Sequence, residues 1–322
     1  MVGQRQPIGI AVGRVLTEHT AQITSLDFTA DGELLLSAGE DDRLCVYSCQ
    51  SGALQRVVQS PRHGISIARF THDPLSVICA SRRGGAAAAD PEAHALRYHS
   101  LHDNCFLRFF RGHTAPVVAL ELSPKEDLFA TASEDGTLRT WDLRSPNCAG
   151  VLRFDPGRRR SALSYDPDGV VLAAALSGGL IKLFDVRKTA TGPFTTFAPA
   201  LGDSKDFASV CFSRDGKLML LGTAQGVVFN MDAYTGELLQ HYTGHANARG
   251  VPLEACFSAD GAQVLCGSED GTVWRWRTRD AQPLSAPLTG HSGPVAAIRC
   301  NPTRQLVASA CEHVCLWLPL NR

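Results

Sequence analysis

The sequence predicts an all-β protein, a seven-bladed β-propeller formed by residues 1–322 as a single domain. Three observations predict this fold. A unit of short apolar runs recurs seven times, turns rich in Gly and Asp separate the runs, and no stretch has the apolar periodicity of an amphipathic helix. The units follow one another at about 40–45 residues, which is the length of one propeller blade. Only the second interval is clearly longer.

The clearest copy of the unit lies in residues 123–150, SPKEDLFATASEDGTLRTWDLRSPNCAG. An apolar strand is expected at 128–133, a tight turn at Glu134-Asp135-Gly136, and a second strand that ends at Trp141-Asp142. Gly112-His113 precedes them. The order Gly-His, Ser-x-Asp-Gly and Trp-Asp is typical of a WD-repeat blade.

Equivalent positions can be followed through all seven units. The first predicted strand of each unit ends near an aromatic or apolar residue: Phe28, Phe70, Leu122, Tyr165, Phe212, Phe257 and Cys300. The second is a run rich in Val, Leu and Ala, at 34–39, 76–81, 128–133, 170–177, 218–223, 264–268 and 306–310. The third ends at Tyr47, His99, Trp141, Phe184, Met231, Trp276 and Trp317. Such apolar runs predict strands that are buried on both faces.

The two ends of the chain are expected to share one blade. The sequence stops five residues after Trp317, so the seventh unit has no outer strand of its own. Residues 8–16 precede the first unit and alternate weakly in polarity, as a strand does. We expect this N-terminal strand to complete the seventh blade, because a closed ring has no open sheet edge to pair with other chains.

The recurring polar residues predict a hydrogen-bond network inside each blade. In the third unit the set is His113, Ser133, Asp135 and Trp141, and in the sixth it is His245, Ser268, Asp270 and Trp276. His19 and Ser37, with Asp41 or Asp42, form the set of the first unit. His, Ser and Asp also make up a hydrolase triad, but repetition around a ring favours a structural role over one active site. The sequence has no nucleophile elbow, P-loop or cofactor fingerprint, so we expect neither an enzyme nor a bound cofactor.

The cysteines predict a reducing compartment and no metal site. There are 11, an odd number, scattered through apolar runs. Cys45 and Cys49, like Cys311 and Cys315, are four residues apart. Residues four apart on one strand lie roughly 13 Å from each other, so neither pair is expected to bind one zinc ion.

Charge and hydropathy exclude other classes of protein. The net charge of −1 disfavours wholesale nucleic-acid binding. The sequence has no apolar run of about 18 residues, so no membrane span is expected. The N-terminal residues lack the apolar segment of a signal peptide.

Loops that depart from the unit are the places where function is expected. Three of these loops carry basic residues: Arg82, Arg83, Arg158, Arg159, Arg160 and Arg249. The turns between second and third strands carry acidic residues: Glu40, Glu134, Glu269 and Glu312. These connections lie on one face of a propeller, conventionally called the top face. One interpretation is that the charges serve solubility. The other is a docking surface for an acidic or phosphorylated peptide, because Arg recognises phosphate through two parallel hydrogen bonds.

Several stretches resemble one family more closely than a generic WD repeat. They are LRYHSLHDNCFLRFFRGH at 96–113, WDLRSPNCAG at 141–150, GPFTTF at 192–197, GHANARGVPLEACFSADG at 244–261 and ASACEHVCLWLP at 308–319. They resemble the Swd-two type WD-repeat protein, from roughly residue 20 to the C-terminus. This subunit is shared by the Set-one/COMPASS histone methyltransferase and by the PNUTS–protein phosphatase one complex of transcription termination.

The resemblance implies a nuclear, non-enzymatic scaffold, monomeric within a larger complex. Its expected partners are a segment of the SET-domain methyltransferase or a PNUTS-like phosphatase-targeting subunit, and through them the phosphorylated polymerase tail. The sequence departs from the family pattern at 84–89 and at Arg158–Arg160. A generic WD-repeat adaptor that binds RNA or another complex, and more remotely an enzyme, remain as alternatives. The basic runs lack the interleaved aromatic residues that stack on bases.

Overall fold

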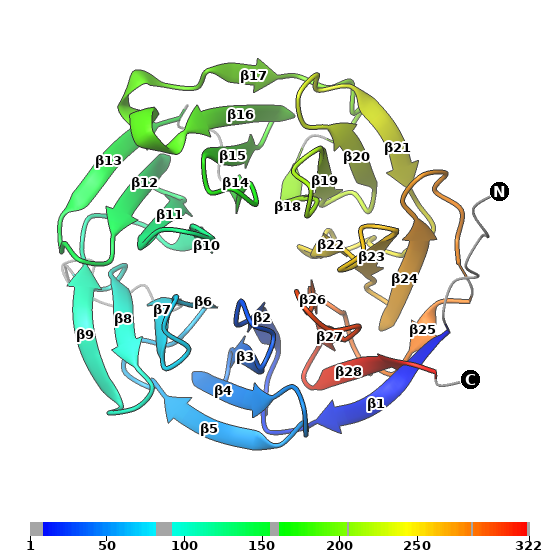
Figure 1. Cartoon of the computed structure of the whole chain (residues 1–322), viewed down its shortest axis with the longest axis horizontal. Helices are drawn as coiled ribbons and strands as arrows, with labels where there is room; N and C mark the ends of the chain where they lie inside the picture. The colour runs from blue at the N-terminus through cyan, green and yellow to red at the C-terminus, as the bar shows by residue number, and fades with distance from the viewer. Residues whose placement is uncertain (1–8, 82–91, 155–160, 205, 285, 321–322) are drawn as a thin grey trace.

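The computed structural model describes residues 9–81, 92–154, 161–204, 206–284 and 286–320. The strands in these residues form seven four-stranded antiparallel sheets, which surround a central axis as the blades of a closed ring (Figure 1). The predicted all-β, seven-bladed propeller is therefore confirmed. The described part of the chain contains one 3-10 helix, Val186–Thr191, and none of its helices is long and apolar enough to cross a membrane.

Every blade places its strands in the same order from the central axis outward. The innermost strands are β2 (Ile23–Phe28), β6 (Ile67–Phe70), β10 (Val117–Leu122), β14 (Ser161–Tyr165), β18 (Phe207–Phe212), β22 (Ala255–Phe257) and β26 (Ala297–Cys300). The second strands are β3 (Leu34–Gly39), β7 (Ser76–Ala80), β11 (Leu128–Ser133), β15 (Val171–Leu176), β19 (Leu218–Thr223), β23 (Gln263–Gly267) and β27 (Val307–Ala310). Consecutive strands pair because tight turns, many with Gly at positive φ, connect them.

The outer half of each blade repeats the same way. The third strands are β4 (Arg43–Ser48), β8 (Leu96–Ser100), β12 (Thr137–Asp142), β16 (Leu180–Asp185), β20 (Val228–Asp232), β24 (Thr272–Arg277) and β28 (Val314–Pro319). The outermost strands are β5 (Leu54–Gln59), β9 (Cys105–Phe110), β13 (Cys148–Arg153), β17 (Thr195–Phe197), β21 (Leu238–Tyr242), β25 (Leu288–Thr289) and β1 (Ile10–Leu16).

The apolar residues of the second and third strands form the core between neighbouring blades. In β11, Phe129 to Ser133 are all buried, since a second strand has a neighbouring blade on each face. The residue predicted near the end of each third strand is buried in every blade, with at most 6% of its surface exposed. Each sheet is therefore held by the apolar side chains of the two sheets beside it.

The N-terminal strand closes the ring, as predicted. β1 pairs antiparallel with β28, from Ile10 opposite Pro319 to Leu16 opposite Val314, with an irregularity between Val12 and Arg14. The prediction placed the start of this strand at Ile8, which lies outside the described residues. The seventh blade is thus built from both ends of the chain.

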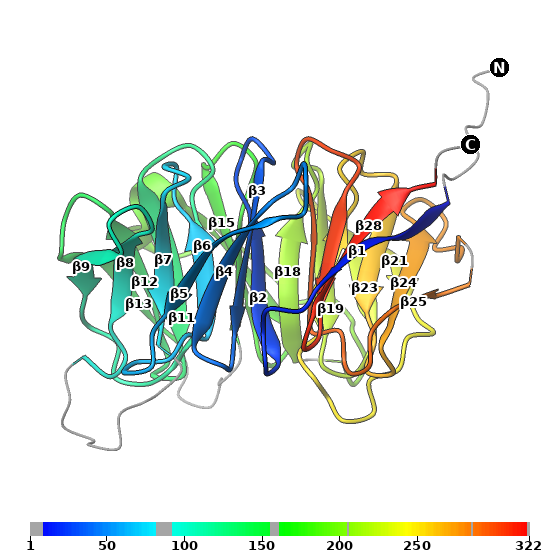
Figure 2. The same ribbon diagram turned by 90° about the horizontal axis from the view of Figure 1, so that it is seen from below.

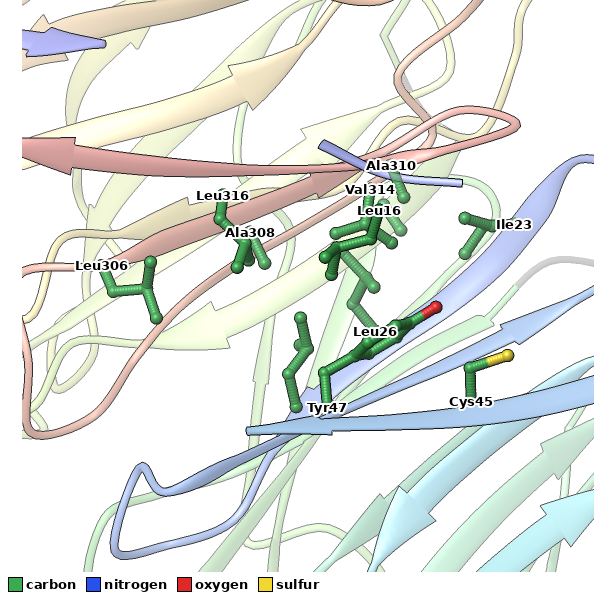
Figure 3. Close-up of a cluster of buried hydrophobic side chains, with 12 residues drawn as sticks. Leu16, Ile23, Leu26, Cys45, Tyr47, Leu306, Ala308, Ala310, Val314 and Leu316 are labelled. Atoms are coloured by element: carbon green, nitrogen blue, oxygen red, sulfur yellow. The ribbon is translucent and has the colours of Figure 1, made fainter. Parts of the chain in front are cut away.

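An apolar cluster fastens this closure to blade one. Leu16 of β1 packs with Val314 and Leu316 of β28 and with Leu26 of β2 (Figure 3). Leu16 is 3% exposed, whereas its neighbour Val15 points to solvent and is 44% exposed. Burial of one apolar face of β1 therefore adds to the backbone pairing that joins the last blade to the first.

The top face carries the connections that enter the innermost strands and the turns between second and third strands. Every blade has the same strand order, so these connections gather at one rim of the disc; the connection from β1 into β2 lies at the lower rim in Figure 2. The turns at 40–42 and 134–136 belong to this face. The opposite rim carries the turns between first and second strands.

Candidate functional site on the top face and in the central channel

The predicted polar set of blade three forms a network, but with one residue exchanged. Nδ1 of His113 lies 2.9 Å from Oδ2 of Asp135, and its Nε2 lies 2.8 Å from Oγ1 of Thr131. Trp141 donates its indole N–H to the same Thr131 hydroxyl at 2.8 Å. Ser133, which was predicted to link His and Trp, instead donates to the carbonyl of Ala115. Residues two apart on β11 share a face, and Thr131 is the one that meets His113 and Trp141.

Electrostatics keep this network in a single charge state near neutral pH. Burial raises the pKa of Asp135, but hydrogen bonds from Thr137 and His113 outweigh it and lower that pKa to about 2. Burial lowers the pKa of His113 below its usual value. Both ring nitrogens of His113 are used within the blade and its side chain is 1% exposed. The imidazole is therefore not placed to act as a base on an external substrate.

The contacts of the His with a hydroxyl and an Asp recur in blade one, and the network is partly replaced in blade six. His19 contacts Asp41 at 2.9 Å and Ser37 at 2.8 Å. In blade six Ser268 accepts from the backbone N–H of Ala246, and Asp270 accepts from Thr272. Cys266 occupies the position of Thr131, and His245 Nδ1 has no partner among the described atoms. Burial lowers the pKa of His245 to about 4, and Trp276 packs edge-on against its ring.

The predicted top-face residues fall into three groups. Glu134 and Glu312 are exposed. Arg249 and Glu269 are bound to each other: the Arg249 Nε and backbone N–H donate to the two Glu269 oxygens at 2.8 and 2.9 Å. The charge of Arg249 is therefore matched by Glu269, and its role in partner binding stays a prediction. The remaining basic residues, Arg82, Arg83, Arg158, Arg159 and Arg160, lie outside the described residues.

Charged residues that the sequence prediction missed line the central channel. Arg69 Nη2 lies 3.0 Å from Glu121 Oε1, and Arg299 Nη2 lies 3.3 Å from the same oxygen. Arg299 also contacts Glu254 at 3.5 Å, while Asp27 accepts the backbone N–H of Phe70 at 2.8 Å. We call Asp27, Arg69, Glu121, Glu254 and Arg299 the channel cluster. It joins blades one, two, three, six and seven across the axis of the ring.

The channel cluster shifts the ionisation of its members in opposite directions. Burial raises the pKa of Asp27 to about 6, although Arg69 and Arg299 oppose the shift. Burial also raises the pKa of Glu121, but the same two guanidinium groups outweigh it and hold that pKa below its ordinary value. When Asp27 is ionised the cluster carries one negative charge in excess, and protonation of Asp27 removes it.

A repeated sequence position could have revealed most of this cluster. Asp27, Arg69, Glu121 and Arg299 each directly precede the residue that ends an innermost strand. Side chains alternate across a strand, so the residue before a buried aromatic faces the other way, toward the axis. Charges at this position in four blades signal contact across the channel. Glu254 precedes β22 and has no such signature.

The channel opens on the top face into a hollow of about 600 Å³. Glu40 and Glu134 border it, with Gln22, Ser66 and Pro252 beside them, and the channel cluster lies deeper. Acidic side chains outnumber basic ones along its lining. This opening therefore favours a cationic or hydrogen-bond-donating group of a partner.

A larger hollow, of about 1420 Å³, lies on the opposite face between blades five, six and seven. Leu239, Arg277 and Trp317 are among its lining residues. In blade six β25 pairs with β24 at Thr272–Thr289 and Val273–Leu288, and Pro283 forms a bridge with Trp276 further along β24.

Comparison with known proteins agrees with this architecture. The WD domain, G-beta repeat family matches residues 11–48, 104–142, 236–277 and 282–317. WD repeat-containing protein 82 of Drosophila melanogaster is 39% identical over 308 residues, covering 96% of this chain and 94% of that protein. Set1 complex component swd2 of Schizosaccharomyces pombe is 37% identical over 226 residues, covering 68% of this chain and 59% of that protein. COMPASS component SWD2 of Saccharomyces cerevisiae is 29% identical over 223 residues, covering 69% of this chain and 64% of that protein.

These similarities extend beyond the blade signature. The fruit-fly relative aligns along 96% of the chain, well beyond the four stretches that the WD domain family matches. Together with the seven blades of the ring, this sequence similarity shows that the chain belongs to the Swd2-type family of WD-repeat proteins.

Proposed function

We propose that this chain is a non-catalytic scaffold subunit of a nuclear Set1/COMPASS-type histone methyltransferase complex, in which its top face holds a segment of a partner protein. The similarity to proteins named Set1 complex component swd2 and COMPASS component SWD2 carries the proposal. A rigid ring with two broad faces suits the role, since it presents loops from several blades to one partner at once.

The engagement of the polar signature residues supports the absence of catalysis. His113 and Asp135 bind each other and the blade around them. Arg69 and Glu121 in the channel bind each other at 3.0 Å. A catalytic acid or base needs an atom within reach of a substrate. These groups instead serve packing between strands and between blades.

The chemistry of the top face supports a peptide partner with mixed charge. The acidic mouth near Glu134 suits a basic side chain that enters the channel opening. The sequence also places Arg158, Arg159 and Arg160 before the innermost strand of blade four. That run suits an acidic or phosphorylated flank of the same segment, such as the polymerase tail.

Affinity purification from nuclear extract tests the proposal. The tagged full-length chain is expected to recover a SET-domain methyltransferase, identified by mass spectrometry. Recovery of a PNUTS-like phosphatase-targeting subunit would assign the chain to the termination complex instead. Recovery of neither would contradict a role in these complexes, while leaving the fold unaffected.

Two charge-reversal variants locate the docking surface. Glu134→Lys with Glu312→Lys changes the exposed turns of the top face, and Arg158→Glu, Arg159→Glu and Arg160→Glu reverses the basic run. Each is expected to reduce partner recovery. Arg187→Glu with Lys188→Glu is the matched control, because both residues lie on the outer 3-10 helix and are exposed. Equal recovery by all variants would exclude the top face as the docking surface.

Nucleic acid is the remaining alternative partner. Binding of the isolated chain to RNA or DNA with a steep salt dependence would favour it. The proposal expects weak, salt-insensitive retention instead. A filter-binding series at several salt concentrations separates these outcomes.

A further inference from the structure

His291 of blade seven lacks the carboxylate partner that the corresponding His residues have in blades one and three. Asp41 and Asp135 contact Nδ1 of His19 and His113, respectively, in those blades. The turn between β27 and β28 is two residues shorter than that between β11 and β12, since Ala310 pairs with Val314 but Ala132 pairs with Leu138. The shorter turn reads Cys311-Glu312-His313, and Nδ1 of His291 faces a thiol there.

Two imidazoles and two thiols converge at this turn. Nδ1 of His291 lies 3.2 Å from Sγ of Cys311 and 4.0 Å from Sγ of Cys315. Nδ1 of His313 lies 3.5 Å from Sγ of Cys311. The ligand atoms of His291, His313 and Cys315 all lie within 4.8 Å of one another. A tetrahedral zinc ion with Zn–S of about 2.3 Å and Zn–N of about 2.0 Å sets its ligand atoms about 3.3–3.8 Å apart.

The expectation that Cys311 and Cys315 could not share a metal rested on their lying along one strand. The structure corrects this premise. Cys311 follows β27 and Cys315 lies on β28, where it pairs with Ser309, so the two residues belong to opposite arms of a hairpin. A hairpin turn brings residues four apart close together, whereas an extended strand separates them by roughly 13 Å.

Hydrogen bonds on the far side of each ring orient the imidazoles. Nε2 of His313 donates to the Gly290 carbonyl at 3.0 Å, which leaves Nδ1 without a proton and facing Cys311. Nε2 of His291 lies 2.6 Å from Ser309 Oγ, and that hydroxyl accepts the indole N–H of Trp317 at 2.7 Å. Metal-bound His residues are held in this way, with one nitrogen on the metal and the other on a backbone or side-chain partner.

We propose that His291, Cys311, His313 and Cys315 form a Zn²⁺ site at the top-face end of blade seven. Imidazole and thiolate are the ligands that zinc prefers in structural sites, and two of each make a common tetrahedral set. Hard cations such as Mg²⁺ and Ca²⁺ need oxygen ligands instead. On binding, each thiol releases one proton, so Zn²⁺ and two thiolates form a neutral unit, which suits buried Cys311 and Cys315.

The site would tie two segments of blade seven together. His291 comes from the connection into β26, whereas the other three ligands come from the β27–β28 hairpin. β28 also pairs with the N-terminal strand β1. Bound zinc therefore stabilises the blade through which the ring is closed, whichever partner complex the chain joins.

Metal content and spectroscopy of the full-length chain test the proposal. After removal of metal with a chelator and exchange into chelator-free buffer, the chain is expected to bind about one Zn²⁺ and to melt at a higher temperature with zinc than without it. The Co²⁺-substituted chain is expected to show thiolate-to-cobalt charge transfer and the intense visible bands of tetrahedral Co²⁺. A chain that binds no zinc, or Co²⁺ without a thiolate band, would show that the four residues form only a thiol–imidazole contact.

Variants separate the site from adventitious binding elsewhere. His313→Ala changes a half-buried turn residue and is expected to weaken zinc binding by more than about tenfold, since losing even an outer-shell partner costs that much. Cys315→Ser should also weaken zinc binding. If the buried serine prevents folding, His313→Ala still tests the site. His102→Ala with Cys105→Ser is the matched control, because these residues are exposed on blade two. Unchanged zinc affinity in His313→Ala would overturn the proposal.

Discussion

Thr131 accepts a hydrogen bond from the Trp141 indole at 2.8 Å across the β11–β12 pair. The same hydroxyl lies 2.8 Å from Nε2 of His113, so one side chain joins the second strand, the third strand and the connection into the first. All three side chains are buried. Loss of this hydroxyl leaves two buried polar groups without a partner.

Thr131→Val is therefore expected to destabilise the protein by about 1–3 kcal/mol, the usual cost of leaving a buried donor or acceptor unsatisfied. Chemical denaturation measures the change in the free energy of unfolding. Thr140→Val is the matched control, since Thr140 is a partly exposed residue of the adjacent strand, and it should stay within about 0.5 kcal/mol. Equal values for the two variants would mean that the Thr131 contacts add nothing to stability.

Asp27→Asn is expected to stabilise the protein above pH 7. The folded-state pKa of Asp27, about 6, is higher than its ordinary value of 3.8, so the ionised form is disfavoured by folding. Its contribution to stability is present at low pH and is lost as the pH rises from about 4 through 6. Asn keeps an oxygen for the Phe70 N–H but carries no charge.

The expected gain at pH 8 is about 1–3 kcal/mol, since one pKa unit corresponds to about 1.4 kcal/mol. The difference between Asp27→Asn and the unchanged protein should shrink as the pH falls to 5. Unfolding by urea at both pH values measures it. Asp203→Asn, at an exposed loop position, provides the control and should show no such trend. A variant less stable than the parent at pH 8 would contradict this prediction.

His245 makes the protein sensitive to mild acid. Burial lowers its folded-state pKa from 6.5 to about 4, so the unfolded chain binds a proton in the window where the folded chain does not. Stability from this group is present above about pH 6.5 and is lost as the pH falls toward 4. His245→Gln should therefore reduce the loss of unfolding free energy between pH 7 and 4.5.

The readout is the pH slope, because the substitution also changes the stability at neutral pH. His241→Gln is the control, since His241 is exposed on the preceding strand β21, and it should leave the slope of the parent protein. A His245→Gln slope that matches the parent would place the acid sensitivity elsewhere in the ring.

Deletion of residues 1–17 is expected to destabilise the whole propeller. The deletion removes β1, which exposes the edge of β28 and uncovers the cluster around Leu16. The truncated chain should melt at a lower temperature and associate through the open edge, as measured by thermal unfolding and size-exclusion chromatography.

A point substitution separates packing from backbone pairing at the closure. Leu16→Ala should cost about 2–5 kcal/mol, as expected for a buried Leu, whereas Val15→Ala on the exposed face of β1 should cost far less. Unchanged melting of the truncated chain would show that the ring does not depend on this closure.

The sequence by itself determined the blades. Short apolar runs, Gly- and Asp-rich turns and a large residue at the end of each third strand are local patterns, and they recur often enough to identify the blades despite their irregularities. The weak alternation of the N-terminal strand also predicted the closure, which the pairing of β1 with β28 confirms. The sequence determined less well which residue of a strand makes a given side-chain contact. Thr131 and Ser133 share a face, and the pattern alone does not say which one meets Trp141.

Tertiary structure decided which side chains meet. The choice of Thr131 follows from its pairing with Arg139, which sets the register of β11 against β12. The channel cluster joins residues from five blades, and His291 meets Cys311 across a gap of 20 residues. Such contacts depend on the closure of the ring and on turn length, which are non-local. Local periodicity therefore gives the strands, while the closed ring brings the charged groups of the channel together and the turn length in blade seven brings His291 to Cys311.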